Sequence, residues 1–120
     1  MSNIRSHEDL IVWQKAMELV KGIYELTSHF PDVEQYCLTQ QIRRSAISIP
    51  SNIAEGKRRE SKKVLRNFLF MAFGSGAELE TQLAIARAMP FSKNLDFQPA
   101  LSLLDEVMRM LNVMIRKLAT

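Results

Sequence analysis

The stretch DFQPALSLLDEVMRMLNVMIRKL, from Asp96 to Leu118, has the clearest periodicity in the chain. Its large apolar residues recur at alternating steps of four and three residues, which is the heptad repeat of a helix that packs along one side. These residues are Phe97, Leu101, Leu104, Met108, Leu111, Ile115 and Leu118. The stretch therefore predicts a helix over residues 96–118 that forms one side of a helical bundle.

A second apolar series on the same stretch follows the same steps, turned by about 100° around the helix axis. It consists of Ala100, Leu103, Val107, Met110 and Met114. One seam satisfies the core of a four-helix bundle, and a second exposed seam of this length would favour aggregation. We therefore expect the second series to form an interface with another copy of the chain. The alternative is a fourth helix that is deeply buried within one chain.

Three further helical stretches precede this one, over residues 8–28, 33–56 and 61–89. Their apolar residues also keep three-and-four spacing. Phe30-Pro31, Gly56 and Pro90 mark their ends, because proline does not continue a helix and glycine is a common C-terminal cap. All connections are short, so consecutive helices should be antiparallel. The sequence predicts an all-α, up-down-up-down antiparallel four-helix bundle, in a single domain over residues 1–120.

Single residues add detail to this prediction. Asp32 and Ser61 are expected to cap the second and third helices at their N-termini. Pro50 is expected to kink the second helix without ending it. Gly74 and Gly76 each cost about 1 kcal/mol relative to alanine inside a helix, so a neighbouring helix is expected to pass unusually close to them.

The composition places the chain among helix-rich proteins of a reducing compartment. Of its 120 residues, 47% are hydrophobic, and only four are Gly and four Pro. The single cysteine, Cys37, cannot form an internal disulfide. The N-terminus lacks an apolar signal region, and the longest uncharged run, residues 67–77, is about half the length of a membrane-spanning helix. We therefore expect a cytoplasmic protein.

The formal net charge of +3 is unevenly distributed. Residues 43–66 contain eight basic and two acidic residues, whereas the rest of the chain contains eight basic and eleven acidic ones. The basic turn between the second and third helices consists of Lys57, Arg58, Arg59, Lys62, Lys63 and Arg66. Gathered at one end of the bundle, beside a helix N-terminus, these side chains predict contact with nucleic-acid phosphates. The alternative is a solvated charged turn that keeps the protein soluble.

No catalytic or metal-binding constellation is apparent in the sequence. His7 and His29 lie at opposite ends of the first helix, on the order of 30 Å apart, and neither has the Glu-x-x-His spacing of a di-metal bundle. The serines are not accompanied by a nucleophile elbow or a phosphate loop. We therefore expect a protein that is not an enzyme and that uses no metal or cofactor.

Four charged residues are expected to have a structural role instead. In an antiparallel hairpin of the second and third helices, Glu78 and Glu80 fall near the level of Arg43 and Arg44. The two glutamates are two residues apart and face different directions, which does not favour shared acid/base chemistry. We expect ion pairs between these arginines and glutamates, either across the hairpin or between subunits.

Three segments carry a family resemblance: DLIVWQKA at residues 9–16, QIRRSAISIPSNIAEG at 41–56 and GSGAELE at 74–80. Together, and in this order, they resemble the small bacterial four-helix-bundle proteins known as 23S rRNA-intervening sequence proteins. The likeness extends over nearly the whole chain. Because most members of that family lack a demonstrated biochemical role, the name of the family does not give a function.

The resemblance carries its own implications for assembly and partners. Members of the family form homopentameric barrels with a basic surface, which implies a ring of five here. A relative, the accessory variability protein of diversity-generating retroelements, has the same pentameric bundle and binds nucleic acid and a reverse transcriptase. RNA or DNA, and a reverse transcriptase or another protein, are therefore the partners that the resemblance implies.

Two hypotheses of function follow. The first is an oligomeric, non-catalytic protein that binds nucleic-acid phosphates through the basic turn, with affinity that falls steeply with salt. The second is an oligomeric scaffold or adaptor for a protein partner, in which the basic turn serves solubility. The second hypothesis predicts a salt-tolerant partner and weak binding of nucleic acid.

Overall fold

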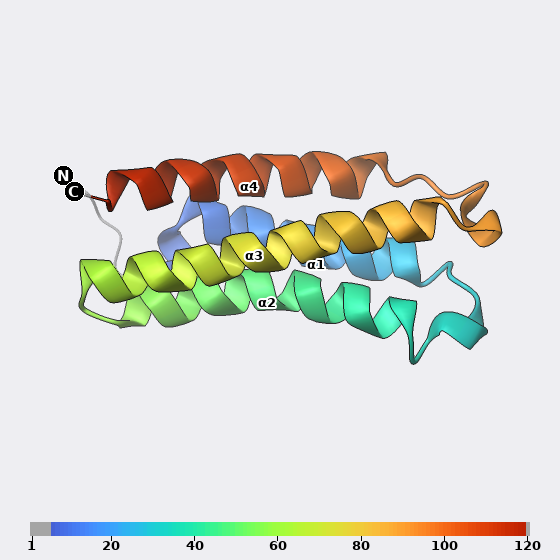
Figure 1. Cartoon of the computed structure of the whole chain (residues 1–120), viewed down its shortest axis with the longest axis horizontal. Coiled ribbons are helices and arrows are strands. Elements are labelled where there is room, and N and C mark those ends of the chain that lie inside the picture. Colours follow the sequence, from blue (N-terminus) through green and yellow to red (C-terminus); the bar gives the residue numbers. More distant parts are fainter. Residues whose placement is uncertain (1–5, 120) are drawn as a thin grey trace.

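The computed structural model describes residues 6–119, which form four long helices that run alternately up and down (Figure 1). They are α1 (Ile11–Thr27), α2 (Leu38–Arg58), α3 (Lys62–Arg87) and α4 (Gln98–Lys117). Short 3-10 helices lie at His7–Asp9, Asp32–Glu34 and Pro90–Ser92. These helices confirm the predicted all-α four-helix bundle. The bundle is an elongated rod that measures 48 × 21 × 20 Å.

The core runs along the axis of this rod. α1 and α3 each pack against both α2 and α4, so α1 and α3 stand diagonally across the bundle. Each helix contributes branched aliphatic side chains that are at most 1% exposed, and burying one such side chain stabilises the fold by about 1.5–3 kcal/mol. The largest of them are Leu19, Ile23, Ile42, Ile49, Ile53, Leu69, Leu79, Leu83, Leu104 and Leu111.

The four helices lie where the sequence predicts them, but some of their ends differ. α1 begins at Ile11 rather than at residue 8, and α2 begins at Leu38 and continues past Gly56, its expected cap, to Arg58. Ser61 caps α3 as expected, because its Oγ accepts a hydrogen bond from the backbone N–H of Val64 at 3.2 Å. Asp32 does not cap α2, which begins only at Leu38. The preceding residues form a 3-10 turn, and Cys37 has a non-helical backbone (φ −119°, ψ −102°) that delays the helix.

α2 continues through Pro50, which is buried. Small polar residues beside it join α2 to α3. The hydroxyl oxygens of Ser48 and Ser75 lie 2.8 Å apart and share a hydrogen bond. Asn52 Nδ2 donates to the backbone C=O of Ser48 at 2.8 Å, so the polar groups on this side of α2 are paired.

Gly74 and Gly76 test the expectation of close helix approach, and Gly56 shows a further close contact. A Cβ on Gly56 would lie 2.6 Å from the Cβ of Phe68, so the end of α2 touches α3. A Cβ on Gly76 would overlap the Met108 side chain of α4. At Gly74, by contrast, a Cβ would meet no atom within 4 Å. The expectation is therefore confirmed for Gly76 and wrong for Gly74 within the chain.

The second apolar series of α4 does not form one exposed seam. Ala100 and Val107 are only 3% and 0% exposed, because they belong to the hydrophobic core of the single chain. The prediction that they form a subunit interface is wrong for these two residues. Leu103, Met110 and Met114 are half-buried at the edge of the core and keep part of their surface exposed.

Candidate nucleic-acid interface

The basic turn lies at the end of the bundle where α4 finishes (Figure 1). Arg66 of α3 connects the basic turn to the end of α4, because its Nε donates a hydrogen bond to the backbone C=O of Ile115 at 3.0 Å. The last turn of α4 therefore brings Arg116 and Lys117, both exposed, to the same end. We call this set of side chains, the basic turn together with Arg116 and Lys117, the basic end.

Sequence analysis did not include Arg116 and Lys117 in the patch. They are about fifty residues from the basic turn along the chain, and only the packing of α4 against α3 brings them there. The signal that could have found them was the topology itself. In a bundle with an even number of alternating helices, the last helix ends where the second helix turns into the third.

Three cations of the basic turn are exposed and without a carboxylate partner. Arg58, Lys62 and Lys63 are exposed, and none of the ion pairs among residues 6–119 includes them. Lys57 is half-buried in the last turn of α2 and is likewise outside these pairs. These four side chains keep their donors for an external anion.

Arg59 and Arg66 have partners within the chain. Arg59 Nη2 forms an ion pair with Glu55 Oε1 at 2.5 Å, and its guanidinium lies 5.6 Å from the ring centre of Phe68. Arg66 is half-buried, with its guanidinium 4.8 Å from the ring centre of Phe70 and its Nε bonded to α4. The predicted phosphate-binding role of these two arginines is therefore shared with a structural one.

Arg43, predicted to face Glu78 or Glu80, turns toward α1. Its Nε donates to Thr27 Oγ1 at 2.8 Å, and its guanidinium lies 4.3 Å from the ring centre of Tyr24. Arg44, Glu78 and Glu80 are exposed and belong to none of the ion pairs in the described part of the chain. The predicted pairs across the hairpin do not form within one chain; pairing between subunits stays a prediction.

A second cluster of cations lies far from the basic end, between α1 and the start of α2. These cations line a cavity of about 390 Å³. Its lining includes two arginines and no carboxylate, and consists of Tyr24, Gln35, Tyr36, Thr39, Gln40, Arg43, Arg44 and Ile47. Tyr36 is 81% exposed. We call this cavity the tyrosine–arginine pocket. Sequence analysis missed it because its residues come from two helices and a connection.

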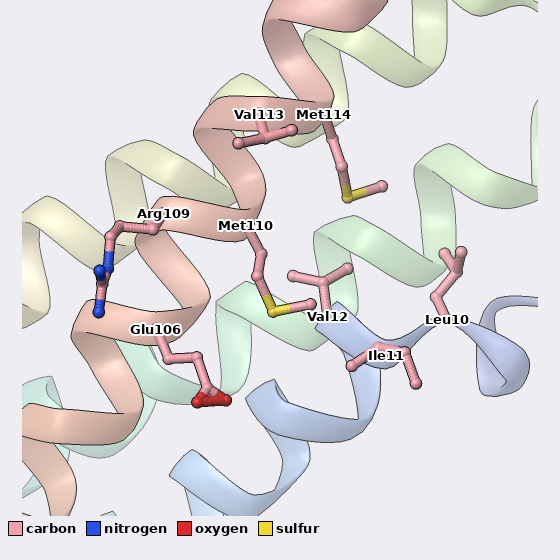
Figure 2. A pocket seen from close by; sticks show the side chains of 8 residues that line it. All are labelled: Leu10, Ile11, Val12, Glu106, Arg109, Met110, Val113 and Met114. Atoms are coloured by element: carbon pink, nitrogen blue, oxygen red, sulfur yellow. The ribbon is translucent and has the colours of Figure 1, made fainter.

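An apolar surface depression lies between the start of α1 and the end of α4 (Figure 2). This α1–α4 groove has a volume of about 550 Å³. Its lining is Leu10, Ile11, Val12, Met110, Val113 and Met114, with Glu106 and Arg109 at one edge. The side chains of Met110 and Met114 project from α4 toward α1, and Arg109 points away from them.

An ion pair closes one side of the groove. Lys15 Nζ lies 3.2 Å from Glu106 Oε1 and 3.7 Å from Glu18 Oε2, so it links α1 to α4. The hydrogen bond and charge of Glu106, with a smaller contribution from Glu18, raise the pKa of Lys15 above its ordinary value of 10.5.

The residue types that catalyse or bind metals are dispersed. His7 packs edge-on against Trp13 with ring centres 5.0 Å apart, and His29 Nε2 lies 3.5 Å from Glu25. Among residues 6–119, no three His, Cys, Asp or Glu side chains gather as a metal site would require. None of the helices in this part of the chain is long and apolar enough to span a membrane.

Comparison with known proteins relates the chain to a protein family and to a solved structure. The family model described as "23S rRNA-intervening sequence protein" matches residues 8–113. A crystal structure of a protein of unknown function from the S23 ribosomal protein family of Bacteroides thetaiotaomicron has the same fold, with a TM-score of 0.71 and 22% sequence identity. The alignment covers 92% of this chain and 100% of that one. No curated protein matches the sequence.

Proposed function

This chain belongs to the 23S rRNA-intervening sequence protein family, and we propose that it is a non-catalytic, oligomeric protein that binds nucleic-acid phosphates through its basic end. The observation that carries this proposal is the convergence of unpaired cations from two separate segments. Arg58, Lys62 and Lys63 of the basic turn share one end of the rod with Arg116 and Lys117 of α4.

The chemistry of the basic end favours the phosphate backbone over the bases. Long, exposed lysine and arginine side chains can follow phosphates without a fixed geometry, and each neutralised phosphate releases condensed counterions. The residues that make up the basic end are lysines and arginines, and the neighbouring rings of Phe68 and Phe70 lie beside the guanidinium groups of Arg59 and Arg66. We therefore expect similar affinity for RNA and DNA, with little dependence on sequence.

Assembly of several copies would multiply the number of phosphate contacts that the basic ends make. We propose that the chain forms a homo-oligomer, and the family resemblance implies a ring of five. In such a ring the basic ends of all copies would contact one nucleic acid, and the effective concentration of each further contact would be high. The exposed apolar side chains of the bundle, among them Ile11, Phe70 and Met71, support association.

A salt series on three proteins tests the proposal. The patch variant carries Arg58→Ala, Lys62→Ala and Lys63→Ala. The control variant carries Lys21→Ala, Arg87→Ala and Lys93→Ala, which removes the same charge from exposed positions away from the basic end. Binding of fluorescent RNA and duplex DNA is measured between 50 and 300 mM salt, after light scattering has shown that all three proteins have the same mass.

We expect the native protein and the control variant to bind with a steep dependence of affinity on salt. The patch variant should bind weakly, and its slope should be shallower by about 0.9 for each phosphate contact removed from duplex DNA. Equal losses in both variants would mean that only the overall charge matters. Absence of binding by the native protein at the lowest salt would refute the proposed function.

The tyrosine–arginine pocket favours a second candidate, an adaptor for a protein partner. Tyrosine and arginine are the residue types that contribute most to protein interfaces, and here they surround one cavity. A reverse transcriptase is the partner that the family resemblance implies. A Tyr36→Ala/Arg44→Ala variant should lose a salt-tolerant protein partner while its affinity for RNA stays unchanged; loss of RNA affinity instead would contradict this candidate.

A further inference from the structure

The outward face of α3 carries a repeat that the core does not use. Its members recur at alternating steps of four and three residues and are all exposed: Phe70, Gly74, Ala77, Thr81, Ala84 and Ala88. This spacing places them in one line along the helix. A solvent-facing line of a helix normally carries charged residues, whereas this one has none. We call it the α3 line.

Gly74 on this line has no explanation within the chain. A Cβ there would meet no atom within 4 Å, and its φ is not positive. Glycine nevertheless costs about 1 kcal/mol relative to alanine inside a helix. Gly56 and Gly76, in contrast, each leave room for a neighbouring side chain. Since glycine also permits close approach of another backbone, Gly74 points to a helix outside the chain.

The α1–α4 groove is a second apolar surface without a partner in the described residues. Two contacts between α3 and α4 show where the groove lies along the long axis relative to the α3 line. Arg66 of α3 bonds to Ile115 of α4, and Gly76 faces Met108. The first half of the α3 line lies between these two contacts on α3, and residues 110–114 of the groove lie between them on α4. The two surfaces are therefore level along the long axis.

The two surfaces also lie on different sides of the rod. α1 and α3 are diagonal, so a groove that opens between α1 and α4 does not face the outer side of α3. They can meet only between two copies. A head-to-tail contact between different surfaces forms either a closed ring or an open filament. Because the surfaces are level, each added copy brings no rise along the axis, which favours a ring.

We propose that the α3 line of one copy seats in the α1–α4 groove of the next copy, with Phe70 entering the groove and Gly74 allowing the close approach. The inference rests on the proposed assembly and assigns its two surfaces. A second copy is the favoured occupant because each chain supplies both an apolar ridge and an apolar groove at one height. An unrelated partner on either surface would leave the other uncovered.

Two blocking variants test the assignment. The ridge variant, Gly74→Gln, adds a helix-favouring side chain where the chain itself has open space. The groove variant, Val113→Glu, places a charge at a groove position that is 41% exposed. The control, Gly22→Gln, makes the first change at another helical glycine with open space around it. Light scattering measures each mass against the 13.8 kDa of one chain, and circular dichroism checks that each is folded.

We expect the native protein and the control to be oligomers and the two blocking variants to be monomers. A mixture of the two variants is the decisive sample. The ridge variant keeps an intact groove and the groove variant keeps an intact ridge, so together they should form one dimer of twice the monomer mass and grow no further. A symmetric contact of α3 with α3 would instead let the groove variant assemble by itself.

Each remaining result has one meaning. A native protein that is a monomer would overturn the proposed assembly. An oligomeric native protein together with an oligomeric ridge variant would overturn only the surfaces assigned here. Should Gly74→Gln prove unfolded, Ala77→Gln on the same line replaces it, because it exchanges one helix former for another at an exposed position. Assembly of a folded Ala77→Gln variant like the native protein would equally overturn the assignment.

Discussion

Glycine has two different uses in this chain, and the difference is visible one residue at a time. Gly56 is buried at the end of α2, where the Cβ and Cδ1 atoms of Phe68 and Leu65 would lie 2.6 and 3.1 Å from an added Cβ. The Cβ of Phe68 is fixed to the backbone of α3, so a clash there cannot be relieved by a side-chain rotation. Gly22 and Gly74 lie in open space.

Gly56→Ala should therefore destabilise the protein. The added methyl group would push α2 away from α3, and overpacking of this kind costs about 1–3 kcal/mol. Urea unfolding measures the loss. Gly22→Ala is the matched control, since it relieves the helix of a glycine without a clash and should stabilise by about 0.5–1 kcal/mol. A Gly56→Ala variant as stable as the native protein would show that α2 and α3 are not in such close contact.

Lys15 gives a prediction for alkaline pH. Its pKa is raised above 10.5 mainly by Glu106, so the folded protein holds this proton more tightly than the unfolded chain does. The ion pair therefore contributes fully below pH 10.5, and its contribution is lost as the pH rises through the higher pKa of the folded state. NMR titration of the Lys15 side chain should give a pKa above 10.5, and in a Glu106→Gln variant the value should fall back toward 10.5.

At the scale of the helix, the last turn of α4 depends on Arg66. The final carbonyls of a helix lack partners within it, and the Nε of Arg66 supplies one for the C=O of Ile115. The α2–α3 turn and the end of α4 are thus held together by a residue that sequence analysis assigned to phosphate binding.

Arg66→Met should loosen this end of α4. The substitution keeps an apolar side chain but removes the donor, and the loss of one such hydrogen bond costs about 1 kcal/mol. Amide hydrogen exchange should become faster over residues 114–118 and stay unchanged in the middle of α4. Arg116→Ala, at the same end but without that bond, is the control. Unchanged exchange in Arg66→Met would mean that the contact contributes nothing to the helix end.

Helix positions were predictable from the sequence because the three-and-four spacing of apolar residues recurs in all four segments. The start of α2 was not, because the backbone at Cys37 leaves the helical region without any proline or glycine to signal it. The candidate site was predictable only as a cluster along the chain. Which of its cations are free depends on local partners: Glu55 pairs with Arg59, and the backbone of Ile115 binds Arg66.

The interface predicted on α4 failed in part for a related reason. Periodicity shows that a helix has a wide apolar surface, but it does not show which neighbour covers each part of that surface. Ala100 and Val107 are buried in the core of the chain, whereas Met110 and Met114 line the groove. Exposed small residues such as Gly74 and Ala77 attract no attention in a hydrophobicity pattern, although the open space around Gly74 became informative once the fold was known.

On the scale of the whole molecule, charge differs between the two ends of the rod. The basic end and the α1–α2 and α3–α4 connections lie at opposite ends of the rod, which is 48 Å long, and in these connections Asp32, Glu34 and Asp96 outnumber Lys93. A polyanion should therefore approach the basic end rather than these two connections.

Protection from amide exchange by bound RNA should follow this polarity. At low salt, residues 57–66 and the last turn of α4 should exchange more slowly with RNA than without it, while residues 28–37 and 88–97 should be unaffected. Addition of salt to the level at which binding is lost should remove the protection, which serves as the control. Protection at both ends, or only at the far end, would contradict a phosphate-binding role of the basic end.

The even number of helices has a practical consequence. Because α1 begins and α4 ends at the basic end, a tag or passenger domain attached directly to the start of α1 or to the end of α4 would emerge there and would stand between the cations and a nucleic acid (Figure 1). In a ring, every copy would display its passenger on the same face. A label inserted at the far end, between Ser92 and Leu95, would leave that face clear.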